Sequence, residues 1–199
     1  IAKRAGFDGV EIHAVHEGYL LDQFTTAFTN HRTDKFGGDL RGRTTLPVAI
    51  VKEVKGTVGK DFPVVLRFSI KSCVKGFNSG GLEGEDYQEF GRDADEGYTI
   101  APWFEEAGYD AFDADEGSYD AWYFAHPPVY QRHGLYLDHT KRLKEVVSAP
   151  VIVAGKNDIP ELAESALAER KADMIVLGRA LLADPSWPQK VLSGKEDQI

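Results

Sequence analysis

The sequence has 199 residues, of which 42% are hydrophobic, and its formal net charge is −9. This length and apolar content suit one domain with a sizeable core, and the acidic balance argues against nucleic acid or an anionic membrane as a partner. Cys73 is the single cysteine, so the chain cannot form an internal disulfide or a multi-cysteine metal site by itself. No apolar run approaches the roughly 20 residues that span a bilayer, and the first residues lack a signal-peptide pattern. We therefore expect a cytoplasmic protein.

Short apolar runs recur along the chain, each after a charged helix end and a small or glycine turn. They predict strands that start near residues 9, 63, 110, 150 and 173. Several of these runs are almost continuously apolar, which is typical of parallel strands covered on both faces.

Helical patterns separate the predicted strands. Residues 43–58 carry apolar side chains at helical spacing, and residues 87–107 hold a second pattern interrupted by glycines. Asp158, Pro160 and Glu161 have the order of an N-cap, a first-turn proline and a capping-box residue, and they predict a third helix. This strand–helix alternation implies right-handed crossovers and a parallel sheet.

The alternation predicts an α/β fold of the (β/α)8 TIM-barrel type, with the last five of its eight units in residues 1–199. A Rossmann sheet is the competing architecture, but no G-x-G-x-x-G follows a predicted strand. The chain starts as if in the last turn of a helix, so we expect a fragment of a longer chain. Long segments follow the predicted strands at 25–39, 70–84 and 115–138, on the side that holds the active site of barrels.

The first predicted strand ends within GVEIHAVHEGYLLDQF, which carries His13, His16 and Tyr19. Zincins place H-E-x-x-H on a helix, whereas here His-Ala-Val-His-Glu follows a strand, so we expect no metal. Histidines at a barrel mouth can hydrogen-bond a ligand or exchange a proton with it, and the Tyr19 phenol can donate a proton in a shielded site. The alternatives are structural histidines and a packing tyrosine.

Arg67 interrupts the otherwise apolar strand VVLRFS. Burying an unpaired guanidinium is costly, so Arg67 needs an anionic or electron-rich partner. That partner is either a ligand or an acid of a neighbouring strand, such as Asp113 or Asp115. The residues alone favour neither alternative.

The last two predicted strands end in VAGKNDIPE and VLGRALLADP. Gly155 and Gly178 let backbone N–H groups approach an anion closely, and Lys156 and Arg179 add positive charge. The loops after the last two strands of βα barrels are a frequent phosphate site, so these four residues predict one.

The segment 115–138 is long, aromatic and rich in turn residues. Its ring-bearing candidates are Tyr119, Trp122, Tyr123, His126 and Tyr130. We expect a lid or the wall of a substrate pocket, and a packed surface loop is the alternative.

With these residues gathered, the sequence resembles the old yellow enzyme family of NADH:flavin oxidoreductases. Within that family it is most similar to the 2-enoate reductase group, whose relatives are the bile-acid-inducible oxidoreductases and the 2,4-dienoyl-CoA reductases. The resemblance rests on AGFDGVEIHAVHEGYLLDQF, TNHRTDKFGGDLRGR, FPVVLRFS and VLGRALLADPSWPQK, in the family's order along the whole chain. It implies a barrel that binds FMN, with residues 1–199 as its strands four to eight. It also implies hydride transfer from NAD(P)H through the flavin to the C=C bond of an enoate or enone.

The resemblance implies roles for the residues after the first strand. His13 and His16 would hydrogen-bond the carbonyl or carboxylate of the substrate, and Tyr19 would donate a proton to its α-carbon. Glu17 is an extra residue relative to the shorter H-x-x-H-G-Y form. The histidine pair and the tyrosine therefore come from two patterns, and either Tyr19 or a histidine can be the proton donor.

For the cofactor, the resemblance implies that Arg67 stabilises negative charge on the reduced flavin. The residues that would hold the FMN phosphate are Gly155, Lys156, Gly178 and Arg179. In the 2-enoate reductase group a 4Fe-4S cysteine cluster and an FAD domain follow this region, outside residues 1–199. Because part of the flavin cradle would also lie outside them, we expect weak FMN binding by residues 1–199 alone. Two alternatives remain: a non-flavin barrel enzyme for a phosphorylated metabolite, and an inactive part-barrel scaffold that forms homo-oligomers through open edge strands.

Overall fold

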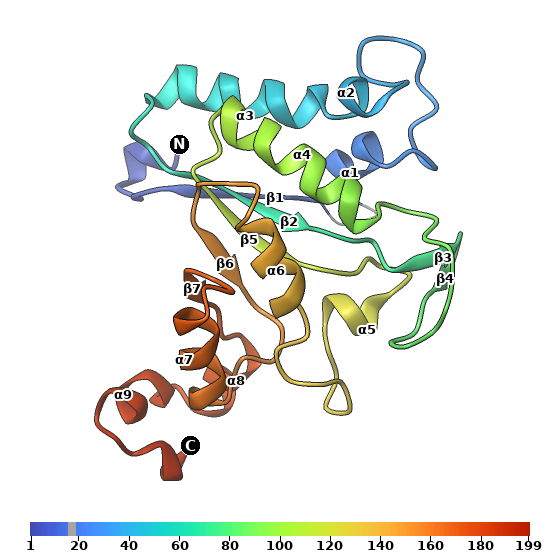
Figure 1. Cartoon of the computed structure of the whole chain (residues 1–199). Coiled ribbons are helices and arrows are strands. Elements are labelled where there is room, and N and C mark those ends of the chain that lie inside the picture. The colour runs from blue at the N-terminus through green and yellow to red at the C-terminus, as the bar shows by residue number, and fades with distance from the viewer. Residues whose placement is uncertain (16–18) are drawn as a thin grey trace.

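The structure, a computed structural model, describes residues 1–15 and 19–199. Five parallel strands form one sheet in the order β1-β2-β5-β6-β7 (Figure 1). They are β1 (Val10–Val15), β2 (Val64–Ser69), β5 (Ala111–Asp115), β6 (Val151–Val153) and β7 (Met174–Ile175). Each strand begins one residue after its predicted start, so the predicted α/β order with a parallel sheet is confirmed. A small antiparallel pair, β3 (Val74–Gly76) and β4 (Ser79–Gly80), lies apart from this sheet.

Helices connect the strands and complete the C-terminal end. They are α1 (Leu20–Thr25), α2 (Leu40–Arg43), α3 (Thr45–Val58), α4 (Ala94–Ala107), α5 (Trp122–Ala125), α6 (Leu137–Leu143), α7 (Pro160–Ala168), α8 (Arg179–Ala183) and α9 (Trp187–Leu192), with 3-10 turns at Lys3–Ala5 and Glu196–Gln198. Helices α3 and α4 lie side by side over one face of the sheet, whereas α7, α8 and α9 lie at its β7 end (Figure 1). No helix in the described part of the chain is long and apolar enough to cross a membrane.

Two helix starts differ from the prediction. The helix expected over 87–107 begins at Ala94, because the side chain of Asp93 accepts the N–H of Glu96 at 2.7 Å and caps the helix there. The predicted capping role of Asp158 is wrong: the N-cap of α7 is Ile159, and no side chain caps it. The Asp158 carboxylate instead lies 3.2 Å from Nδ1 of His133. Pro160 occupies the first turn of α7, as predicted.

The core lies between the sheet and helices α3 and α4. Val64, Leu66 and Phe68 of β2 are fully buried in it, and each such side chain contributes about 1.5–3 kcal/mol. Phe68 packs edge-on against Phe104 of α4, with ring centroids 6.2 Å apart. Because side chains alternate between the faces of a strand, Arg67 points to the opposite face of the sheet.

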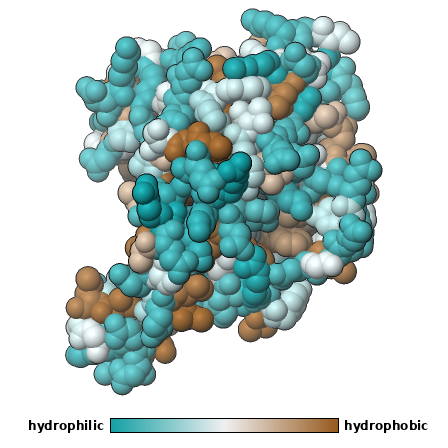
Figure 2. Space-filling view, viewed as in Figure 1, coloured by the Kyte–Doolittle hydropathy of each residue, from teal (hydrophilic) through white to brown (hydrophobic). Residues whose placement is uncertain are grey.

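Hydrophobic residues also reach the surface at the C-terminal end. On the face drawn in Figure 2 they gather where α9 lies in Figure 1. Leu192 of α9 is 88% exposed, and Leu182 of α8 is 84% exposed. Exposed apolar surface of this kind is typical of contacts with further polypeptide. The predicted homo-oligomer stays a prediction.

Candidate functional site

Three strands carry a row of polar side chains on the sheet face opposite α3 and α4. His13, Arg67 and Asp113 are register partners across β1, β2 and β5, and register partners share a face of the sheet. Asp115, two residues further along β5, extends the row toward the carboxyl ends of the strands. In parallel α/β folds, that end is where ligands bind.

Arg67 binds both carboxylates of β5. Its Nη1 donates to Asp113 at 2.5 Å, and its Nη2 donates to Asp115. Burial lowers the pKa of Arg67, but the charges of Asp115 and Asp113 outweigh burial and hold the pKa above its ordinary value. The acids of the neighbouring strand are thus partners of Arg67. A guanidinium has five N–H donors, so it can hold two carboxylates and still donate to a ligand.

His13, Tyr19 and Arg67 together line a small cleft of about 60 Å³. The rings of His13 and Tyr19 lie 4.5 Å apart between centroids, tilted by 57°. Tyr19 is the N-cap residue of α1 and is partly exposed, so its ring is within reach of a ligand. His16 lies outside the described residues, and its role stays a prediction. Within ranges 1–15 and 19–199, no group of three or more His, Cys, Asp or Glu side chains is placed to hold a metal ion.

A larger cleft, of about 530 Å³, opens at the ends of β6 and β7. The residues predicted to bind phosphate all line it: Gly155, Lys156, Gly178 and Arg179. Arg67 and His126 line both this cleft and the small one. The two clefts therefore adjoin, and the structure brings the predicted phosphate residues next to the predicted substrate residues.

Lys156 and Arg179, two of the cationic residues that line the large cleft, hydrogen-bond the loop at residues 127–131. Lys156 Nζ donates to the carbonyl oxygen of Val129 at 2.8 Å and to that of Gln131. Arg179 Nη2 donates to the carbonyl oxygen of Pro127 at 2.6 Å. These contacts were not expected from the sequence, because the carbonyls belong to a distant segment. They keep both positive charges at the wall of the cleft.

Gly155 sets the shape of the large cleft. Its φ is +96°, and a Cβ there would lie 2.5 Å from the buried ring of Tyr136. We predict that Gly155→Ala lowers the free energy of unfolding by about 1–3 kcal/mol, because backbone strain and overlap both oppose a side chain. At Gly178, in the same cleft, an added methyl group would meet no atom within 4 Å apart from those of the adjacent residues, so Gly178→Ala should change stability little. Chemical denaturation measures both variants, and an equal loss in the two would contradict the prediction.

The segment 115–138 forms one wall of the small cleft through three of its five predicted ring residues. Tyr119, Trp122 and His126 line the cleft. Tyr119 and Trp122 stack with centroids 5.3 Å apart and planes 19° apart, and Trp122 lies 4.0 Å from His126 between ring centroids. Tyr123 instead hydrogen-bonds the chain just after β4, and Tyr130 is 79% exposed. Of the five predicted residues, Tyr119, Trp122 and His126 therefore line the small cleft, whereas Tyr123 and Tyr130 do not.

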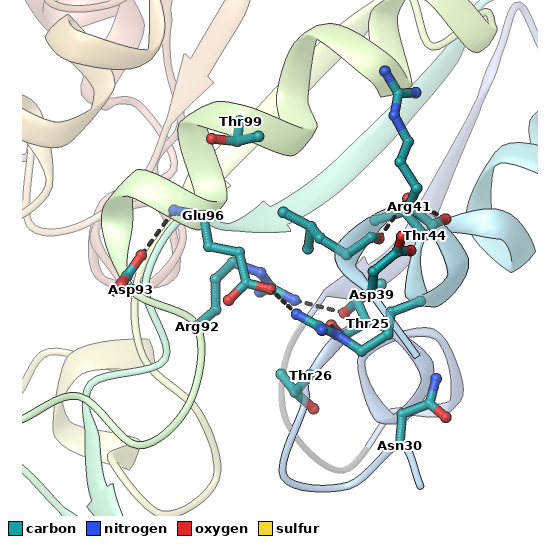
Figure 3. Close-up of polar contacts among 12 residues, drawn as sticks. Thr25, Thr26, Asn30, Asp39, Arg41, Thr44, Arg92, Asp93, Glu96 and Thr99 are labelled. Carbon is teal, nitrogen blue, oxygen red and sulfur yellow. Dashed lines mark hydrogen bonds and ion pairs between the residues drawn. The ribbon is translucent and has the colours of Figure 1, made fainter. Parts of the chain in front are cut away.

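A buried ion pair fixes α1 to the end of β2, and the sequence did not predict it. Arg92 and Asp22 are each 1% exposed and pair with one another. Arg92 also donates to Thr25 Oγ1 at 2.6 Å (Figure 3). It donates to the carbonyl oxygen of Ser69 at 3.0 Å. The two charged residues are 70 positions apart and neither interrupts an apolar strand, so no local signal marked them. Tyr19 is the N-cap of α1, so the ion pair that holds α1 also helps to position Tyr19.

Comparison with known protein sequences places the whole chain in one family. The model of the NADH:flavin oxidoreductase / NADH oxidase family matches residues 1–198. Over its full length the chain is 54% identical to a cinnamate reductase of Clostridium sporogenes, of which it covers 30%. It is 37% identical to an NADH oxidase of Thermoanaerobacter brockii, of which it covers 28%. The chain thus spans about 30% of the length of these relatives.

Solved structures show the same relationship. A 2-naphthoyl-CoA reductase in complex with 2-naphthoyl-CoA matches 98% of the chain with a TM-score of 0.82 and 30% identity, and the match covers 27% of that enzyme chain. An old yellow enzyme homologue of Zymomonas mobilis matches 97% of the chain with a TM-score of 0.70 and 25% identity, over 48% of its own length. The predicted family and barrel-type α/β fold are confirmed. The chain belongs to the NADH:flavin oxidoreductase / NADH oxidase family.

Proposed function

We propose that this protein is an FMN-dependent enoate reductase, which uses NAD(P)H to reduce the C=C bond of α,β-unsaturated carboxylates. The observation that carries the proposal is the adjacency of the two clefts. Arg67 and His126 line both, and the small cleft adds His13 and Tyr19. A cofactor with its phosphate in the large cleft can therefore bring a flat ring to Arg67, beside the residues that would bind the substrate.

The chemistry of the large cleft fits FMN. Lys156 and Arg179 complement a phosphate, and Gly155 and Gly178 allow the backbone to approach it. The volume of about 530 Å³ is typical of a cofactor site. We assign the phosphate to these four residues. To Arg67 we assign the stabilisation of negative charge on the flavin ring.

FMN, when bound, supplies to the β-carbon of the alkene the hydride that it has accepted from NAD(P)H. His13, together with His16, hydrogen-bonds the carboxylate or carbonyl of the substrate and withdraws charge from the alkene. Tyr19 donates its phenolic proton to the α-carbon. The added hydride and proton together convert the alkene to the saturated acid.

The aromatic wall of the small cleft favours an aryl-substituted enoate. Tyr119 and Trp122 are half exposed and stack nearly parallel, and Tyr119 lies beside Tyr19. Flat aromatic ligands pack well against such rings. The 54% identity with a cinnamate reductase supports the same substrate class.

We further propose that residues 1–199 are strands four to eight of the FMN barrel of a longer enzyme. That enzyme would also carry a 4Fe-4S centre and FAD outside these residues. The coverage of 30% of a cinnamate reductase supports a longer polypeptide. Membership in a flavin oxidoreductase family favours this proposal over a barrel enzyme that acts on a phosphorylated metabolite.

Anaerobic turnover tests the proposal. The full-length protein should contain FMN and should oxidise NAD(P)H only when an α,β-unsaturated acid is present. A cinnamate-type acid should have a lower KM than an aliphatic enoate of similar size. A protein without flavin, or one whose NAD(P)H oxidation is indifferent to every enoate, would refute the function. Equal KM values would refute the aryl preference alone.

A further inference from the structure

Two tyrosine hydroxyls meet in the small cleft. The O–H of Tyr119 donates a hydrogen bond to the Oη of Tyr19 at 3.1 Å, and the two ring centroids lie 5.6 Å apart. The residues are 100 positions apart and follow different strands, Tyr19 after β1 and Tyr119 after β5. The sheet therefore brings them together by placing the ends of these strands at one edge.

Tyr119 is held in this position from its other side. Its ring stacks on Trp122, the first residue of α5. The turn that leads into α5 is fixed by Ser118, which is buried and accepts the N–H of Ala121 at 3.3 Å. The stacking on Trp122 thus holds the ring of Tyr119 in the orientation in which its hydroxyl contacts Tyr19.

A hydrogen-bond donor beside Tyr19 would assist Tyr19 in its proposed role as the acid. When Tyr19 gives up its proton, negative charge grows on its Oη, and a hydrogen bond donated to that oxygen stabilises the charged form. The hydrogen bond to Tyr19 raises the pKa of Tyr119, so Tyr119 is protonated and can act as the donor while Tyr19 still carries its own proton. Tyr119 is also 50% exposed, so solvent water can reach it.

We propose that Tyr119 is a positioning residue and proton source for Tyr19. The inference rests on the proposed function and extends it. When the β-carbon of the enoate receives hydride from the bound cofactor, Tyr19 Oη would transfer its proton to the α-carbon. The hydroxyl proton of Tyr119 then moves to Tyr19, and a water molecule reprotonates Tyr119. The net addition to the enoate is one hydride and one proton.

Tyr119→Phe tests this role, because it deletes the O–H and keeps the ring that stacks on Trp122. In the full-length flavoenzyme we expect re-oxidation of the reduced flavin by a cinnamate-type acid to slow by about 10- to 100-fold, the effect of losing a hydrogen bond to a charged group. Reduction of the flavin by NAD(P)H should be unchanged. The matched control is Tyr130→Phe, in the same segment and 79% exposed, which should alter neither half-reaction.

A second readout does not depend on turnover. In protein labelled with ¹³Cζ-tyrosine, the Tyr19 resonance is identified by its loss in Tyr19→Phe. We expect Tyr119→Phe to shift that resonance and Tyr130→Phe to leave it in place. An unmoved Tyr19 resonance, an unchanged re-oxidation rate, or an equal loss in both half-reactions would each overturn the role of Tyr119. If wild-type protein reduces no enoate, the proposed function fails instead, and the resonance still tests the hydrogen bond.

Discussion

Replacing Tyr19 by phenylalanine should slow re-oxidation of the reduced enzyme by an enoate by about 10²- to 10⁴-fold, the usual contribution of a positioned acid. Reduction of the flavin by NAD(P)H should be largely unaffected, because that half-reaction needs no proton at the alkene. The expectation follows from the position of Tyr19 in the small cleft beside His13 and Arg67. Stopped-flow absorbance of the flavin, recorded separately for each half-reaction, measures both rates.

A histidine variant separates the proton donor from the group that binds the substrate. His13→Gln retains a hydrogen-bond donor but cannot act as an acid near neutral pH. If Tyr19 is the acid, His13→Gln should raise the KM for the enoate more than it lowers the limiting rate. A small effect of Tyr19→Phe together with a large loss of limiting rate in His13→Gln would move the acid role to His13. An equal loss in both half-reactions of Tyr19→Phe would remove Tyr19 from that role.

Replacing Arg92 by leucine should lower the free energy of unfolding by about 3–5 kcal/mol, because it leaves the carboxylate of Asp22 buried without its ion-pair partner. Arg92 and Asp22 are each 1% exposed, so water cannot compensate for the lost contact. The change also removes the hydrogen bonds from Arg92 to Thr25 and to the carbonyl oxygen of Ser69. Urea denaturation followed by circular dichroism measures the difference.

Two further variants identify the cause of that loss. Arg32→Leu removes a surface pair with Asp34 and should change stability little, because exposed ion pairs are screened by water. The double variant Asp22→Leu/Arg92→Leu should recover part of the loss, since it no longer buries a lone charge. A loss for Arg92→Leu as small as that for Arg32→Leu would show that the buried pair is not a major source of stability.

The strands could be predicted from the sequence because buried parallel strands consist of almost continuous apolar runs. Each strand of the five-stranded sheet begins one residue after its predicted start. Arg67 was identifiable for the same reason, as a charge inside such a run. The sequence could not decide its partners. Asp113 is its register neighbour, and only the pairing of β2 with β5 brings the two side chains together.

Contacts between segments that are distant in the chain could not be predicted from the sequence. The pair of Arg92 and Asp22 depends on how α1 packs against the end of β2, and no local pattern encodes that packing. The hydrogen bond between Tyr19 and Tyr119 likewise depends on two strand ends that meet at one edge of the sheet. Asp158 shows that a local sequence motif can also mislead. It has the order of an N-cap, but its carboxylate lies beside His133 and does not cap α7.

We propose that the two adjoining clefts form one site for flavin-dependent reduction of an enoate. The most direct test mixes NAD(P)H-reduced full-length protein with a cinnamate-type acid in the absence of oxygen and follows the absorbance of oxidised flavin. We predict that this absorbance returns in a single turnover, with one saturated acid formed for each FMN re-oxidised. FMN that stayed reduced with every enoate, and was re-oxidised only when oxygen was admitted, would contradict this proposal.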